Sequence, residues 1–321
     1  MVPSVREMRW NFRTAPPLYR GYTLQGMDAL ELHGRLYGAN RSFGDSRRWL
    51  VLGHHGILIE GLDDELCATL ERRWGGFLRR TAAGPPRATV RVFRAGPDLW
   101  LAAPQHCEVY RIEALNDPAR RLVVSYHFGI GAEAGPPPSW RIGITDQPDE
   151  PLERILENAL RFVAAHLAVD EGGFAMHAAG VARDGRAFLF AGPSGAGKST
   201  AVRLAAPATG LGDDFGLVVP TEKGWMAPAL PFDNAERIVH RPPGGPFSVA
   251  GIWRLYQASE TRVEQPRADL AVASLMGCIA FPWAMPERSE RLLEHAGRYV
   301  REGCYRHLYF TRETDLWPHL I

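Results

Sequence analysis

A glycine-rich segment, Gly192–Ser199 (GPSGAGKS), limits most tightly how this chain can fold. Its three glycines let the backbone curl so that successive N–H groups point inward and form a nest for an anion. An apolar run, Ala187–Ala191, precedes the segment, and a helical pattern begins near Lys198, so the positive end of a helix aims at the same point. The segment fits the GxxxxGK[ST] pattern, the Walker A phosphate loop. The sequence therefore predicts a nucleotide-binding site at this turn between a strand and a helix.

The lysine of this loop is unusual for the chain, because Lys198 and Lys223 are the only lysines among 37 basic residues. A guanidinium is a planar fork and does not replace a compact ammonium in a phosphate cradle. Lys198 is predicted to reach the β- and γ-phosphates, and the Ser199 hydroxyl to hold Mg²⁺. The side chain of Thr200 is expected to pack or to face the helix. The residues predicted to bind the nucleotide are Gly192, Pro193, Ser194, Gly195, Ala196, Gly197, Lys198, Ser199 and Thr200.

Two adjacent aspartates, Asp213 and Asp214, follow fifteen and sixteen residues after Lys198, between apolar residues. We expect a strand to carry them beside the phosphate loop. Two carboxylates at such a site have distinct uses: one coordinates Mg²⁺, and the other takes the proton of an attacking hydroxyl. The competing interpretation is a solvated turn, which Gly210 and Gly212 would allow.

A hairpin is predicted directly before the loop. The runs His177–Ala182 and Ala187–Ala191 are joined by Arg183-Asp184-Gly185-Arg186, and an Asp-Gly turn between apolar runs is a strong hairpin signal. The strand that feeds the loop should therefore be antiparallel to the strand before it, whereas common P-loop enzymes use a parallel sheet. His177 opens this hairpin, which makes it a candidate for a contact near the transferred phosphate.

Together, His177-Ala-Ala-Gly-Val, the hairpin, the loop and Asp213-Asp214 resemble the catalytic domain of the bacterial HPr kinase/phosphorylase family. That family also has a histidine fifteen residues before the first loop glycine. The resemblance is good over about residues 170 to 220. It implies a P-loop domain similar to the nucleotide domain of phosphoenolpyruvate carboxykinases, α/β with a mixed, largely antiparallel sheet. The C-terminal part is similar to HPr-kinase-like proteins found near peptide-modification genes, on segments such as Ile252–Gln257 (IWRLYQ).

The resemblance implies a phosphotransferase with an alcohol group as acceptor. In this reading Lys198 binds the β-phosphate, Ser199 and Asp214 hold Mg²⁺, Asp213 is the catalytic base, and His177 assists near the γ-phosphate. The donor is ATP, ADP, another nucleotide or pyrophosphate, and the acceptor is a serine-type hydroxyl of a peptide, a protein or a small molecule. Because HPr kinases are also phosphorylases and form hexamers, reversal with inorganic phosphate and assembly into a homo-oligomer are further implications.

Two other function classes remain open from the sequence. One is a nucleotide-gated binding module that does not transfer phosphate, although a pure binder has no use for a second carboxylate. The other is a different P-loop ATPase or small-molecule kinase, because the loop sequence also occurs there. A parallel sheet around the loop would favour that class, and an antiparallel hairpin disfavours it. Which arginine contacts the phosphates is also open among Arg237, Arg241 and Arg254.

The 321 residues are enough for two domains. A Pro/Gly-rich connection ends near Pro151, and helical periodicity follows from Leu152 to Leu167, with Asp149 as the expected cap. We therefore predict a smaller N-terminal α/β domain over residues 1–149, with a role in acceptor recognition left open, and a catalytic domain over residues 150–321. The predicted elements of the first part are a strand pair in Trp49–Glu60, a helix over Asp63–Arg79, and strands at Ala88–Phe93, Leu99–Ala102, Glu108–Ile112 and Arg121–Phe128.

The composition is that of an ordinary folded protein, with 45% apolar residues and a net charge of +1. This balance gives no reason to expect nucleic acid as a partner. No apolar stretch is long enough to span a bilayer, so we expect a cytoplasmic protein without a membrane partner. The four cysteines lack metal-site spacing and are expected to be reduced thiols. The pair His54-His55 has no evident partner in the sequence and is interpreted as structural.

Overall fold

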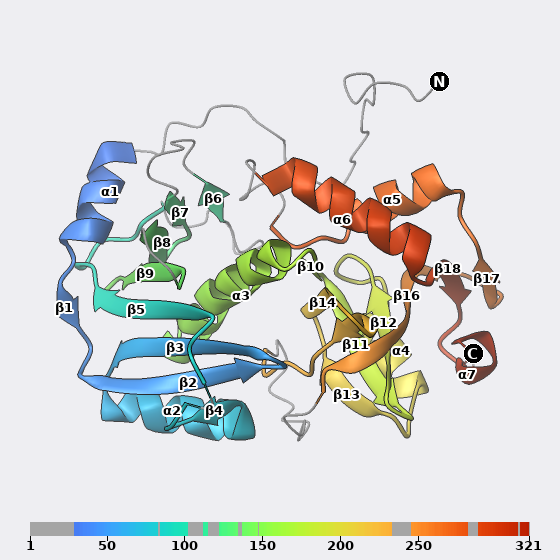
Figure 1. Cartoon of the computed structure of the whole chain (residues 1–321), viewed down its shortest axis with the longest axis horizontal. Helices are drawn as coiled ribbons and strands as arrows, with labels where there is room; N and C mark the ends of the chain where they lie inside the picture. Colours follow the sequence, from blue (N-terminus) through green and yellow to red (C-terminus); the bar gives the residue numbers. More distant parts are fainter. Residues whose placement is uncertain are drawn as a thin grey trace.

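The computed structural model describes residues 29–82, 84–101, 112–114, 122–133, 137–146, 148–232, 245–281, 288–313 and 315–320. Within these ranges the protein is α/β, with two mixed sheets of nine strands each and helices packed on and between them (Figure 1). None of the helices in the described part is long and apolar enough to cross a membrane.

The first sheet has the strand order β4-β2-β3-β5-β9-β8-β7-β6, and β1 pairs with β5. Its centre is parallel, because β5 pairs in parallel with both β3 and β9, while the other pairs are antiparallel. The elements of this part are α1 (Ala29–Gly38), β1 (Arg41–Ser42), β2 (Ser46–Leu52), β3 (His55–Leu62), α2 (Asp64–Trp74), η2 (Gly75–Phe77), β4 (Leu78–Arg79), β5 (Ala88–Arg94), β6 (Glu113–Ala114), β7 (Leu122–Val124), β8 (Phe128–Glu133) and β9 (Ser139–Ile144).

Several predictions for this part are confirmed, and others are wrong. The predicted strand pair is the hairpin of β2 and β3, and the strand at Ala88–Phe93 is β5. Helix α2 starts as predicted, with Asp63 accepting a hydrogen bond from the backbone N–H of Leu66, but it ends at Trp74 because Gly75 turns the chain with φ +51°.

Of the strand predicted at Glu108–Ile112, all but Ile112 lies outside the described residues. The predicted strand at Leu99–Ala102 is wrong over its described residues. The Trp100 ring covers Gly129 and Gly143 instead, where a Cβ would come within 3 Å of the ring. Residues Ser125–His127 interrupt the strand predicted at Arg121–Phe128 and separate β7 from β8.

Helix α3 (Leu152–Asp170) lies between the two sheets (Figure 1). It contacts β8 and β9 of the first sheet and β10 and β14 of the second, so it is buried on nearly all sides. The predicted apolar positions from Ile155 to Leu167 belong to one continuous core that also contains residues of both sheets. The expected cap is wrong, because Pro151 is the N-cap residue and Asp149 forms an ion pair with His127 at 2.8 Å.

The second sheet is mixed and largely antiparallel, with the order β10-β14-β15-β16-β12-β11-β13 and with β18 pairing with β16 and β17. The two parallel pairs are β12 with β16 and β16 with β18. The elements are β10 (Phe174–Met176), β11 (Ala178–Arg183), β12 (Arg186–Ala191), α4 (Lys198–Leu204), β13 (Thr209–Gly212), β14 (Gly216–Thr221), β15 (Gly224–Ala227), β16 (Phe247–Gln257), β17 (Arg262–Glu264), α5 (Ala268–Met276), α6 (Ser289–Glu302), β18 (Tyr305–Phe310) and α7 (Trp317–Leu320).

The strand path of this sheet curls back on itself. Strands β10 and β11 lie near opposite ends of the path, yet only His177 connects them in the chain. Strands β13 and β14 are also distant along the path, and Asp213, Asp214 and Phe215 connect them. Both short connections therefore cross between the same two parts of the curled sheet, which brings His177 and the aspartates to one corner of the fold.

Candidate functional site

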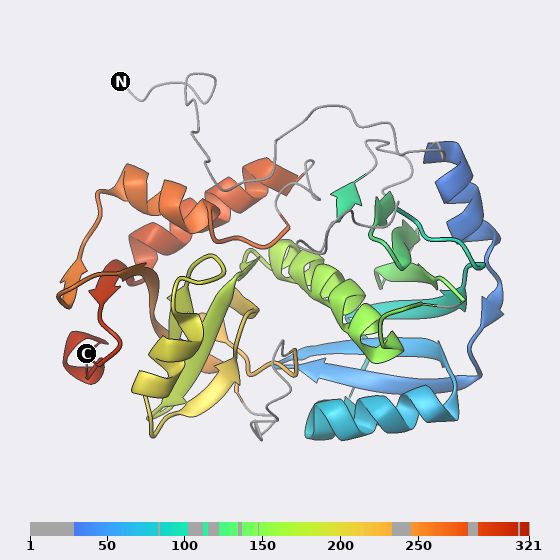
Figure 2. The same ribbon diagram turned by 180° about the vertical axis from the view of Figure 1, so that it is seen from behind.

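The predicted hairpin is confirmed and positions the loop. Strands β11 and β12 pair in register from Ala178–Ala191 to Arg183–Arg186, and Asp184 and Gly185 take positive φ angles in the two-residue turn. Strand β12 leads directly into the glycine-rich loop, and α4 begins at Lys198 on its other side, packed on β11 and β12 (Figure 2). The loop thus connects a strand to a helix N-terminus as the sequence predicts.

The backbone of the loop requires glycine at each of its three glycine positions. A Cβ on Gly192 would lie 2.6 Å from the Cβ of Ala196, so the curl of the loop needs glycine there. Gly195 and Gly197 have φ angles of +78° and +101°, which other residues rarely adopt. A Cβ on Gly197 would also meet the Phe310 ring at 2.8 Å.

The Lys198 side chain bonds to the backbone of its own loop. Its Nζ donates to the carbonyl oxygens of Gly192 at 3.0 Å and Pro193 at 3.2 Å, and the side chain is buried. The loop is also held from β16, where the Gln257 amide donates to the Gly195 carbonyl at 2.7 Å. Ser199 is exposed on the first turn of α4, whereas Thr200 is half-buried.

The aspartates lie beside the loop but not on a strand. Asp213 and Asp214 form a bend directly after β13, so the expectation of a strand carrying both is wrong. The sheet path explains the bend, because the chain must leave β13 and join β14 within three residues. Asp214 is half-buried, and its Oδ1 lies 3.0 Å from the Lys198 Nζ. The structure therefore brings one aspartate of the pair into direct contact with the loop lysine.

His177 lies at the same corner. Its backbone N–H donates to the carbonyl of Cys278 at 2.7 Å, and its carbonyl accepts from the N–H of Gly192 at 3.2 Å. Burial lowers the pKa of His177; the Asp214 carboxylate and a hydrogen bond to the Asp214 backbone oppose this shift, while the Lys198 and Arg161 cations add to it. The structure thus places His177 next to the loop and the aspartates, with its imidazole favoured in the neutral form.

Two cationic side chains and a thiol complete the surroundings. The Arg254 guanidinium on β16 donates to the Sγ of Cys278 at 2.8 Å. Burial raises the pKa of the Cys278 thiol, against the charges of Arg254 and Lys198. Arg161 on α3 forms an ion pair with Glu157 at 2.7 Å. Of the three arginines considered from the sequence, Arg254 is therefore near the loop, and Arg237 and Arg241 lie outside the described residues.

Sequence reasoning missed Arg161, Gln257 and Cys278. Arg161 falls on an apolar helix, where a charged residue among buried positions was the available signal. Cys278 has no motif around it, and its place at the site follows from the hydrogen bond between its carbonyl and the backbone N–H of His177. Another missed contact involves His54 and His55, which are not without a partner: Glu171, at the end of α3, lies close to both.

One comparison with known proteins finds a match. The family model described as "SynChlorMet cassette protein ScmC" matches residues 144–247 of the 321. The matched part runs from the end of β9 to the start of β16 and contains α3, the hairpin, the loop, and Asp213 and Asp214. A search of the curated proteins finds no match. The chain is thus similar to this family over the part that carries the candidate site.

Proposed function

We propose that the protein is a nucleotide-dependent kinase that transfers phosphate to a serine-type hydroxyl group. The observation that carries the proposal is the 3.0 Å contact between Asp214 and Lys198, the lysine of a glycine-rich loop that leads into a helix N-terminus. Such a cradle suits the phosphates of a nucleotide, and adjacent carboxylates suit the metal and the acceptor proton. The proposal includes an HPr-kinase-like fold, which the antiparallel hairpin feeding the loop supports.

The Lys198 ammonium has three hydrogens, and the described structure gives it three acceptors in Gly192, Pro193 and Asp214. An incoming phosphate must therefore replace at least one of them. We infer that Asp214 is the partner released, because the two carbonyls belong to the loop that binds the phosphates. The same exchange frees a carboxylate oxygen beside the site.

The residues fit a magnesium ion, because hard oxygen donors from Ser199 and Asp214 are the ligand type that Mg²⁺ prefers. When bound, the ion would neutralise charge on the β- and γ-phosphates. The backbone N–H groups of the loop hold the phosphates, and Lys198 binds their oxygens. His177 in its neutral form can accept or donate a hydrogen bond near the transferred group.

The phosphate transfer needs one general base, which takes the proton of the acceptor hydroxyl. The acceptor oxygen attacks the γ-phosphorus, the bond to the leaving nucleoside diphosphate breaks, and the hydroxyl proton passes to Asp213. The products are a phosphate monoester and a nucleoside diphosphate. Catalysis rests on positioning and on neutralising charge. The acceptor should be sought among peptides and proteins encoded beside this chain, since the matching family is described as a cassette protein, with free serine as the small-molecule candidate.

The test measures nucleotide binding and phosphate transfer separately. With γ-labelled ATP, Mg²⁺ and these acceptors, wild type should label a hydroxyl. Asp213→Asn should keep nucleotide affinity nearly unchanged and lower the transfer rate by ~10²–10⁴-fold, the usual contribution of a general base. Lys198→Ala should weaken nucleotide binding by roughly 10–100-fold, through loss of charge-assisted hydrogen bonds.

Matched controls come from the chain itself. Lys223→Ala changes the only other lysine, which is exposed in the turn after β14, and Asp184→Asn changes an exposed turn aspartate. Neither should alter binding or transfer. Tight ATP binding without transfer to any acceptor would instead support the nucleotide-gated module. Equal binding by wild type and Lys198→Ala would exclude both functions.

A further inference from the structure

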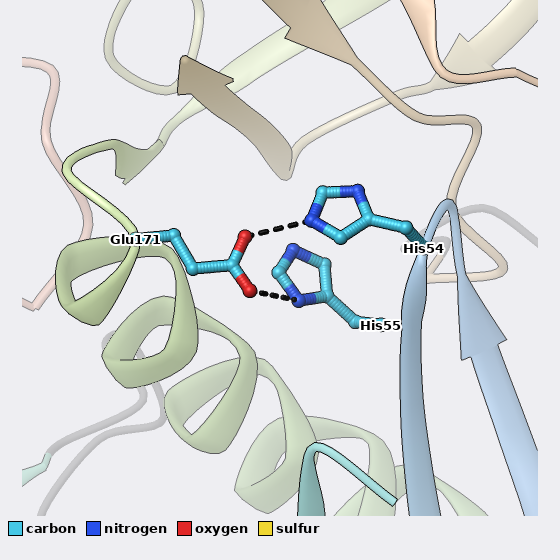
Figure 3. Close-up of side chains that lie close together, drawn as sticks. All are labelled: His54, His55 and Glu171. Carbon is cyan, nitrogen blue, oxygen red and sulfur yellow. Dashed lines mark hydrogen bonds and ion pairs between the residues drawn. The ribbon is translucent and has the colours of Figure 1, made fainter. Parts of the chain in front are cut away.

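Three potential metal ligands meet away from the phosphate loop, where the β2–β3 hairpin approaches the end of α3 (Figure 3). The Nε2 of His54 lies 2.7 Å from Oε2 of Glu171, and the Nδ1 of His55 lies 3.3 Å from Oε1. All three ligand atoms lie within 4.8 Å of one another. Figure 3 shows both imidazole rings pointing toward the same carboxylate.

The backbone fixes this arrangement from two sides. Gly53 and His54 form the two-residue turn between β2 and β3, in which Gly53 takes a φ of +64°. A Cβ on Gly53 would lie 2.9 Å from Pro228, so the turn packs closely on the second half of the chain. Glu171 is the C-cap residue of α3 and is bonded to that helix through its backbone N–H. Neither the histidines nor the glutamate depends on a long unsupported loop.

Burial makes His55 unusual. Its side chain is 2% exposed, and neither ring nitrogen forms a well-oriented hydrogen bond within the described part of the chain. Buried polar atoms normally have such a partner, and a bound ion is one of the explanations for an exception. The 3.3 Å separation from Glu171 places Nδ1 next to a carboxylate without a well-formed hydrogen bond between them.

A cation is already present at the edge of this cluster. Arg87 donates to Oε1 of Glu171 at 2.9 Å, and its side chain is 56% exposed. This contact leaves Oε2 directed at His54. Carboxylates that bind metals are commonly oriented by a hydrogen bond to their other oxygen. Arg87 can therefore hold Glu171 in place while Oε2 serves as a ligand.

We propose that His54, His55 and Glu171 form a binding site for a transition-metal ion, with Zn²⁺ as the metal that fits best. Two imidazole nitrogens and one carboxylate are a recurrent zinc ligand set, with water completing a tetrahedron. With metal–ligand distances of ~2.0–2.2 Å, ligand atoms in a tetrahedron are roughly 3.3–3.6 Å apart. Nδ1 of His55 lies 3.3 Å from Oε1 of the same carboxylate. Nε2 of the half-exposed His54 lies 2.7 Å from the ligand oxygen Oε2, so this ring must move outward to reach the tetrahedral spacing.

Such an ion would join the β2–β3 turn of the first sheet to the end of α3. The site is distinct from the phosphate loop and does not depend on the kinase proposal. Mg²⁺ prefers oxygen ligands, so a nitrogen-rich site should not compete for the ion that nucleotide chemistry needs.

The test uses the full chain, stripped with a chelator and titrated with Zn²⁺ by calorimetry in excess Mg²⁺. One equivalent should bind, and unfolding should shift to higher temperature. His54→Ala and Glu171→Gln should each raise the zinc Kd by at least ~10-fold, the minimum expected for loss of a ligand when second-shell changes already cost ~10–100-fold. His54 is the preferred change because it is partly exposed and its loss should leave the fold intact. His319→Ala, in α7, is the matched histidine control and should change nothing.

Co²⁺ provides a second readout. Its visible absorption should show nitrogen and oxygen ligation without thiolate bands, and Lys198→Ala should leave it unchanged. The proposal fails if no stoichiometric zinc binds, or if His54→Ala and Glu171→Gln bind zinc as wild type does. It also fails if the cobalt spectrum shows thiolate ligation that disappears in Cys278→Ala.

Discussion

Lys198 shows how much chemistry one position carries. The sequence predicts its place in a phosphate cradle, because a chain that otherwise uses arginine keeps a lysine there. Among the described residues the structure adds three acceptors for its ammonium, of which Asp214 alone lies outside the loop. That contact could not be predicted from spacing alone, because it depends on how the chain crosses from β13 to β14.

His177 leads to a prediction about pH. Burial lowers its pKa below the ordinary value of 6.5, so the unfolded chain binds a proton at a pH where the folded protein does not. The contribution of the neutral His177 ring to the free energy of unfolding is therefore fully present above the pKa of the ring in the unfolded chain. It is lost as the pH falls from that value through the pKa of the ring in the folded protein. His177→Gln, which does not titrate, should lose less free energy of unfolding than wild type between about pH 7.5 and about pH 5.

Urea unfolding at a series of pH values measures this difference. His319→Gln serves as control and should follow the wild-type curve. If wild type and His177→Gln lose stability in parallel over this range, His177 is not held neutral by its surroundings. The same comparison made with ATP present would show whether nucleotide binding changes the proton affinity of the ring.

At the level of helices and strands, local sequence signals predict that an element forms better than they predict where it begins and ends. The Asp-Gly turn predicts the β11–β12 hairpin, and the apolar spacing predicts α3, because both depend on neighbours in the chain. The ends of the elements depend on contacts between residues that are distant in the chain. Asp149 pairs with His127 rather than capping α3, and Trp100 covers two glycines rather than joining a strand.

Helix α3 also contains buried charged residues, which its apolar periodicity does not predict. Glu157 is 1% exposed and accepts from Arg161 on the same helix and from Arg73 on α2, at 2.7 and 2.9 Å. Glu157→Ala removes the carboxylate that both guanidinium groups share, so it should destabilise the protein by ~3–5 kcal/mol, the usual cost of breaking a buried pair. Urea unfolding measures the loss. Glu290→Ala, at an exposed position on α6, should stay within ~0.5 kcal/mol of wild type. An equally small change for Glu157→Ala would mean that water solvates the pair.

For the whole molecule, the informative feature is long-range pairing. The candidate site forms because β10 pairs with β14 and β12 with β16, which closes the second sheet around His177 and the aspartates. The motifs in the sequence predict which residues belong to this site, but no local signal predicts that these strands pair. The same holds for the His54, His55 and Glu171 cluster, in which the adjacent histidines are more than a hundred residues away from the glutamate in the chain.

One core predicts one unfolding event, even though the sequence predicts two domains. Phe162 on α3 packs edge-on against Trp140 of the first sheet and against Phe281, with centroid distances of 6.0 and 5.8 Å. Phe281 follows Ala280, whose backbone N–H donates to Ala175 on β10 of the second sheet. Phe162→Ala should therefore cost ~3–5 kcal/mol and weaken both sheets together. Hydrogen exchange followed by mass spectrometry would test this, with peptides from β5 and from β12 reporting on the two sheets. Both should lose protection by the same factor if the sheets unfold together. Loss of protection in β12 alone would show instead that the chain divides into independent units near residue 149, as the sequence predicts.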